Sequence, residues 1–138
     1  MVQHRPPLPA ELELSKVLSE LPNPQTRLNW IVNRVQLFPS WSSEERSRAH
    51  QVEGCLSKLW IRARRDSDAW CFDCDSDSRV VRGLAWLLCE CSSGVDGKQL
   101  LERVNSPPLL DASTLASLTQ TRRLGLYRCW AWMLEQVK

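Results

Sequence analysis

Residues 59–74 read LWIRARRDSDAWCFDC and contain two extended segments joined by a short polar stretch. In the first segment, 59–64, apolar and basic residues partly alternate, and the second segment, 69–74, is another extended run. The connection Arg65-Asp66-Ser67-Asp68 has the composition of a β-hairpin turn. We therefore predict two paired strands which, with an additional strand before Cys55, form a small antiparallel sheet.

Helical patterns precede this predicted sheet. Apolar residues recur at roughly helical spacing from Pro9 to Leu21, and a second pattern runs from Pro24 to about Phe38. Prolines at 22 and 24 separate the two, so they are predicted to form a helical hairpin after a flexible tail at residues 1–8. The polar stretch 40–50 shows little periodicity, and we expect a loop whose charges are solvated.

Further helices are predicted after the strands. Ser76 or Asp77 is expected to cap a core helix that closes at Ser92-Ser93-Gly94. Asp96 is expected to cap a shorter helix that ends before Pro107, and the last helix is expected to begin near Thr119. The shorter helix runs through Leu100, Leu101 and Val104. The predicted buried side of the core helix comprises Val80, Val81, Leu84, Leu87, Leu88 and Cys91, and one face of the last helix carries Leu126, Trp130, Met133, Leu134 and Val137.

The order helices, small sheet, helices is typical of an α+β fold rather than of alternating βαβ units. A chain of 138 residues has the length of one globular domain, so we predict a single domain over 1–138. The net charge of +2 is far from the strongly basic balance of nucleic-acid-binding proteins. No apolar run approaches the roughly 20 residues of a membrane span, and the first residues lack the apolar core of a signal peptide. The sequence thus predicts a cytoplasmic protein whose six cysteines are reduced thiols.

Cys55 is the strongest candidate for a reactive thiol. It follows Gly54 at the junction between a polar stretch and a strand, where a flexible backbone can present a side chain. A thiol of ordinary pKa is a few per cent thiolate at pH 7, and that thiolate is a strong nucleophile toward a sulfur electrophile. Taken alone, however, a Gly-Cys pair is a weak signal, because most single cysteines are small buried hydrophobes.

Two other kinds of cysteine site are less well supported by the sequence. A four-sulfur zinc site would use Cys71, Cys74, Cys89 and Cys91, but residues three apart in a strand or two apart in a helix do not converge. Packed thiols are the favoured interpretation, also for Cys129. A cysteine-histidine hydrolase would pair His50 with Cys55, but the sequence supplies neither an oxyanion hole nor an orienting third group.

The seven tryptophans and two arginines of the last helix have plain structural interpretations. Most of the tryptophans fall in periodic segments and are expected in the core, whereas Trp41 and Trp132 are expected to be exposed. Arg122 and Arg123 fall in the first turn of the last helix, where cations oppose the helix dipole. That placement suggests an anionic partner, but these residues alone favour ordinary surface charge.

Three motifs resemble one known family. Residues 52–60, VEGCLSKLW, resemble the V-x-G-C-x-S-x-V-W pattern of SufE-like proteins. Residues 75–84, DSDSRVVRGL, resemble the family segment D-S-D-x-x-I-V-K-G-L, and residues 118–126, LTQTRRLGL, resemble L-T-x-S-R-x-x-G-L. The three motifs occur in the family's order and, with the helical hairpin, cover nearly the whole chain from about Pro9.

This resemblance implies the SufE/IscU-like α+β fold and a carrier of sulfur rather than a stand-alone catalyst. Cys55 would accept persulfide sulfur from a pyridoxal-phosphate cysteine desulfurase of the SufS type, stimulate its turnover and pass the sulfur to an iron–sulfur scaffold. No cofactor or metal of its own is implied. Gly54, Ser57, Asp75, Asp77 and Arg122 are the motif residues expected to support the Cys55 loop or the docking surface.

Other functions stay open at this point, and several residues differ from the family motifs. One alternative is a desulfurase of the CsdA type with a different sulfur recipient, and a cysteine-based cluster scaffold or metal-binding module is the competing class. His50 stands where the family often has Asn, Leu59 replaces Val and Thr121 replaces Ser. Five further cysteines are unusual, and one close to Cys55 would be able to relay or trap sulfur.

Overall fold

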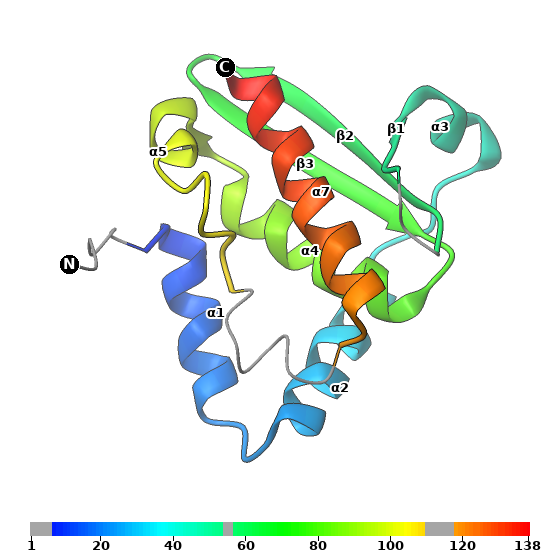
Figure 1. Cartoon of the computed structure of the whole chain (residues 1–138), viewed down its shortest axis with the longest axis vertical. Coiled ribbons are helices and arrows are strands. Elements are labelled where there is room, and N and C mark those ends of the chain that lie inside the picture. Colours follow the sequence, from blue (N-terminus) through cyan, green and yellow to red (C-terminus); the bar gives the residue numbers. More distant parts are fainter. Residues whose placement is uncertain (1–6, 54–56, 110–117) are drawn as a thin grey trace.

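The computed structural model describes residues 7–53, 57–109 and 118–138 (Figure 1). Among these residues, the predicted α+β class is confirmed: one antiparallel sheet packs against the helices at 79–92 and 120–137, and the two N-terminal helices pack on the helix at 79–92. None of the helices within these ranges is long and apolar enough to cross a membrane. The elements are α1 (Pro9–Ser19), α2 (Pro24–Arg34), η1 (Val35–Leu37), α3 (Ser43–Arg48), β1 (His50–Gln51), β2 (Leu59–Asp66), β3 (Ala69–Ser76), α4 (Arg79–Ser92), β4 (Val95–Asp96), α5 (Gly97–Leu101) and α7 (Gln120–Val137).

The sheet is built around the predicted hairpin. Its strand order is β1-β2-β3-β4, and β2 and β3 pair along their whole length, from Leu59 opposite Ser76 to Asp66 opposite Ala69. Each strand is two residues longer than predicted at its C-terminal end, so the turn is Ser67-Asp68, with Ser67 in the left-handed region (φ 56°). The additional strand before Cys55 is confirmed as β1. Strand β4 was not predicted, because two residues are too short to show alternation.

Helix α4 is the centre of the core. It contacts β3 on one side and α1 and α2 on another, and α7 packs beside it (Figure 1). The predicted apolar face of α4 is buried, with Leu84, Leu87 and Leu88 at 0% exposure. Gly83 lets α2 approach closely, since a Cβ there would lie 3.1 Å from both the Cγ2 and the carbonyl oxygen of Ile31. The close crossing of α2 and α4 therefore depends on a residue without a side chain.

The predicted loop over 40–50 is wrong, because α3 occupies its middle. Ser42 accepts a hydrogen bond from the Glu45 backbone N–H (3.2 Å), and the Glu45 carboxylate accepts one from the Ser42 N–H (3.1 Å). This reciprocal pair is a capping box, which satisfies two amides at the helix start. The Ser42 N–H also holds the pKa of Glu45 below its ordinary value. The expectation of solvated charges fails for Arg46, which pairs with the buried Asp75.

Other helix boundaries are partly as predicted. Asp96 caps α5 and Thr119 caps α7, as expected. The cap of α4 is Ser78, not Ser76 or Asp77, because the side chains of both those residues bind near Lys58 instead. Helix α5 ends at Leu101, well before Pro107, so Val104 lies beyond the helix in which it was predicted, and it is exposed.

Two further positions differ in burial from what the sequence suggested. Trp41 is 9% exposed, not surface-exposed as predicted, because the Arg62 guanidinium covers its ring 3.7 Å from the centroid. Leu8, placed in the predicted tail, is buried and precedes the first residue of α1. Both residues are therefore part of the packed structure.

We expect Ser42→Ala to lower the free energy of unfolding by about 1 kcal/mol, because it removes the N-cap acceptor of α3. Ser43→Ala, one residue later and exposed, is the matched control and should change stability by less than about 0.5 kcal/mol. Urea unfolding followed by tryptophan fluorescence measures both. Equal stability of the two variants would contradict the role of the capping box.

Candidate functional site

The residue expected to react, Cys55, and its neighbour Gly54 lie outside the described residues. Their flanks are described, and the two flanks meet. The Val52 N–H donates to the Leu59 carbonyl oxygen (2.8 Å), which extends the pairing of β1 with β2. Val52 and Leu59, the sheet residues on either side of Cys55, therefore lie next to each other.

The flank that follows Cys55 is held at Lys58 by the junction between β3 and α4. The Ser76 hydroxyl donates to the Lys58 carbonyl oxygen (2.6 Å), and the Lys58 N–H donates to the Asp77 carboxylate (2.9 Å). The Asp77 N–H in turn donates to the Lys58 carbonyl oxygen (3.3 Å). Asp77 thus fixes the backbone three residues after Cys55, while Ser57 between them is half-buried.

Asp75 holds a different segment. Its side chain is 0% exposed and accepts hydrogen bonds from Arg46 Nε (2.9 Å) and the Trp41 N–H (3.2 Å). Arg82 Nε lies 3.0 Å from its other oxygen, as an ion pair without hydrogen-bond alignment. Arg82 also donates to the carbonyl oxygens of Val35, Phe38 and Pro39. Asp75 therefore fastens the chain between η1 and α3 to the sheet, whereas Asp77 fastens the flank of Cys55.

The flank that precedes Cys55 is held by α7. Arg128 Nη1 donates to the Glu53 carbonyl oxygen (3.2 Å), two residues before Cys55. One turn later on the same face of α7, the Trp132 ring stacks on His50, with centroids 4.7 Å apart and planes at 9°. Sequence reasoning missed both contacts, because nothing in the local pattern pairs residues 75 or more positions apart.

Arg122, the motif arginine, lies in the first turn of α7 and is half-buried. Its backbone N–H donates to the Thr119 side chain (3.3 Å), which caps the helix. Within residues 7–53, 57–109 and 118–138 the structure shows no hydrogen bond from its guanidinium to the flanks of Cys55. Of the motif residues, Asp77 binds the described flank of Cys55 directly, at Lys58.

The cysteines in the described residues are mostly inaccessible. Cys74, Cys89, Cys91 and Cys129 are 0% exposed, and Cys71 is half-buried on β3. Burial raises the pKa of Cys74, Cys89 and Cys91, so these thiols resist forming the reactive thiolate. Cys71 pairs with Arg64, toward the turn of the hairpin rather than toward Leu59. No group of three or more His, Cys, Asp or Glu side chains suited to a metal ion occurs in the described part of the chain.

Alkylation by iodoacetamide of the native protein is expected to reach Cys71 and to spare Cys74, Cys89, Cys91 and Cys129. A buried thiol reacts only through an opened state, and each 1.4 kcal/mol of opening free energy slows it about tenfold. Peptide mapping after native and urea-unfolded labelling checks this. Equal labelling of Cys71 and Cys89 under native conditions would contradict the packing described above.

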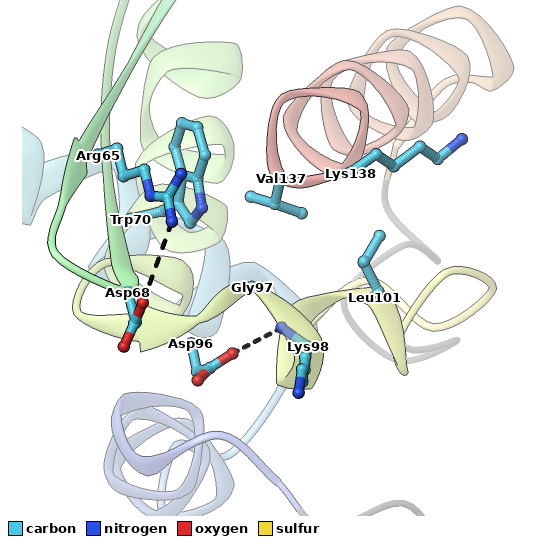
Figure 2. A pocket seen from close by; sticks show the side chains of 9 residues that line it. All are labelled: Arg65, Asp68, Trp70, Asp96, Gly97, Lys98, Leu101, Val137 and Lys138. Atoms are coloured by element: carbon cyan, nitrogen blue, oxygen red, sulfur yellow. Dashed lines mark hydrogen bonds and ion pairs between the residues drawn. The ribbon is translucent and has the colours of Figure 1, made fainter.

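Two surface hollows lie at opposite ends of the hairpin. One, of about 470 Å³, adjoins the Cys55 flank and is lined by α3, Lys58, Trp60 and Asp77. Figure 2 shows the other, of about 440 Å³, at the hairpin turn between α5 and the end of α7. In that hollow Asp68 lies 4.0 Å from Arg65, and Asp96 accepts from the Lys98 N–H. The hollow at the turn is therefore separate from the flanks of Cys55.

Comparisons with known proteins find a matching family, related sequences and a solved structure of the same fold. The family model SufE, described as an Fe-S metabolism associated domain, matches residues 12–137. A SufE-like protein 1 of Arabidopsis thaliana, chloroplastic/mitochondrial, is 29% identical over 83% of this chain and 30% of its own length. An uncharacterized SufE-like protein of Synechocystis is 31% identical over 65% of this chain and 56% of its own. The solution structure of a hypothetical protein of Thermus thermophilus has the same fold, with a TM-score of 0.76 and 16% identity over 96% of both chains. This chain thus spans about a third to about half of the length of these two curated relatives.

Proposed function

The chain belongs to the SufE family, which is associated with iron–sulfur metabolism, and from that premise we propose that it is a sulfur carrier whose acceptor is Cys55. The donor is the persulfide of a cysteine desulfurase, of the SufS type or alternatively of the CsdA type. The recipient is an iron–sulfur cluster scaffold. Pyridoxal phosphate belongs to the desulfurase, and the carrier needs no cofactor. An acceptor thiol must stay reduced, which fits the cytoplasm or a similarly reducing compartment.

The transfer step is a thiol–persulfide exchange. The Cys55 thiolate attacks the terminal sulfur of the desulfurase Cys-S-SH, forming a new S–S bond while the original S–S bond breaks. The desulfurase cysteine leaves as a thiolate, and Cys55 becomes the persulfide. No net oxidation occurs, and the thiol proton lost by Cys55 is balanced by the one gained by the leaving thiolate.

One observation carries the proposal: residues of the second family motif bind the first family motif beside the acceptor. Ser76 and Asp77 both bind Lys58, three residues after Cys55, so two motifs whose contacting residues are 18 and 19 positions apart meet at one place. The other thiols support the same choice of acceptor, because four are buried and Cys71 lies toward the other end of the hairpin. The remaining candidate, Cys55, is also the cysteine of the family motif.

Intact-protein mass spectrometry tests the proposal after incubation with a cysteine desulfurase, pyridoxal phosphate and cysteine. Wild type should gain about 32 Da, reversed by a thiol reductant, and Cys55→Ser should gain nothing. Cys71→Ser is the matched control, because it removes the half-buried thiol and should retain the adduct. An adduct that persists in Cys55→Ser, or is absent from wild type, would sink the proposal.

A further inference from the structure

The two flanks of Cys55 are fastened to different parts of the molecule. The following flank is bound to the β3–α4 junction through Ser76 and Asp77. The preceding flank is bound to α7 through Arg128 at Glu53. Glu53 and Lys58, the described residues on either side of Cys55, are therefore bound to different elements.

The contact with α7 has two points. Arg128 and Trp132 are four residues apart, so both side chains leave the same face of the helix. The first binds the Glu53 carbonyl oxygen, and the second stacks on the His50 ring in β1. The charged Arg128 donor fixes the position and direction of the Glu53 carbonyl group. The stacked rings of Trp132 and His50 restrict rotation of β1.

We infer that Arg128 and Trp132 are positioning residues that set the backbone leading into Cys55 and thereby the rate at which Cys55 takes up sulfur. The inference rests on the proposed role of Cys55. Arg128 is exposed, so the contact with Glu53 is made at the surface, where its loss should not disturb the core. A small misplacement of a reacting atom slows a transfer whose geometry is demanding.

The experiment is a single-turnover sulfur transfer at saturating persulfidated desulfurase, with the Cys55 persulfide followed by quenched mass spectrometry. Arg128→Ala is expected to slow the transfer about fivefold, which corresponds to about 1 kcal/mol. Arg128→Lys, which keeps a cationic donor, should recover part of the rate. Arg65→Ala removes an exposed arginine at the hairpin turn and should leave the rate unchanged.

Trp132 is tested by the pair Trp132→Leu and Trp132→Phe. Phenylalanine keeps a ring for His50 to stack on and should retain the rate, whereas leucine should slow it. Equal rates in the two variants would overturn the part assigned to Trp132.

Affinity and folding are measured beside the rate. The melting temperature and the dissociation constant for the desulfurase should stay at the wild-type values in Arg128→Ala. An unchanged rate at saturating desulfurase, with slower transfer only below saturation or at no concentration, would overturn positioning by Arg128. Should Arg128→Ala fail to fold, Arg128→Met decides the same question, because methionine keeps a long side chain but has no hydrogen-bond donor. Absence of the adduct in wild type would instead refute the proposed function itself.

Discussion

Replacing Glu11 by glutamine is expected to lower the free energy of unfolding by about 3 kcal/mol, because it leaves a buried arginine without its counter-charge. Arg103 is 7% exposed, and two of its nitrogens donate to the Glu11 carboxylate at 2.6 and 2.8 Å. The backbone N–H groups of Leu8 and Leu109 donate to the same carboxylate. The pair therefore joins α1 to the chain that follows α5, across 92 positions of sequence.

Urea unfolding at pH 7 measures this loss. Glu13→Gln is the matched control, since Glu13 is exposed on the same helix and its change should cost less than about 0.5 kcal/mol. The double variant Glu11→Gln with Arg103→Met removes both charges, keeps an amide oxygen as acceptor for the Leu8 and Leu109 N–H groups, and should recover much of the loss because no buried cation is left unpaired. A double variant as unstable as Glu11→Gln would contradict the argument from the unpaired charge.

The same pair predicts how stability depends on pH. Burial opposes ionisation of Glu11, but the hydrogen bonds and charge of Arg103 and the two backbone N–H groups outweigh it, so the folded pKa lies below the ordinary value of 4.5. A carboxyl with a lowered folded pKa stabilises the protein above its unfolded pKa and loses that contribution as pH falls through the folded value. Wild type should therefore lose its advantage over Glu11→Gln below pH 4.5. A difference between the two that stays constant from pH 7 to pH 3 would refute this linkage.

Local sequence patterns predicted the elements whose signals are periodic or fixed by a cap. The alternation in residues 59–64 and the polar turn after it gave the hairpin, and Asp96 and Thr119 gave two helix starts. Helix α3 was missed because six polar residues carry no apolar period, although Ser42 and Glu45 stand at the spacing of a capping box. Strand β4 was missed because its pairing, not its composition, makes it a strand.

The site was predictable only as far as the family motifs reach. The motifs pointed to Asp77, and the structure shows why an acid there is useful: it binds the backbone of Lys58. They did not point to Arg128, which lies 75 residues from its partner Glu53 and just beyond the third motif. The motifs also did not show that Asp75 and Asp77 differ in burial. In the fold, Asp75 lies in β3 and is 0% exposed, whereas Asp77 follows the end of β3 and is exposed.

Asp75→Asn is the second change expected to cost about 3 kcal/mol of stability, because the 0%-exposed carboxylate lies between two cations. An amide of the same shape can accept from Arg46 or approach Arg82 with its single oxygen, but its NH₂ group then faces the other guanidinium. Arg82 retains its carbonyl acceptors at Val35, Phe38 and Pro39, and Arg46 is half-exposed, so the loss should not exceed that for Glu11.

Asp73→Asn is the control that shows whether the loss of stability in Asp75→Asn comes from the burial of its carboxylate or from the loss of charge alone. Asp73 lies two residues earlier on the same strand and also pairs with an arginine, Arg62, but its side chain is 40% exposed. An exposed pair contributes about 0–1 kcal/mol, so the two variants should differ by about 2 kcal/mol in urea unfolding. The Lys58 contacts of Asp77 do not involve Asp75, so folded Asp75→Asn should still take up sulfur on Cys55. Equal stability of Asp75→Asn and Asp73→Asn would show that the buried network around Asp75 does not hold the segment between η1 and α3.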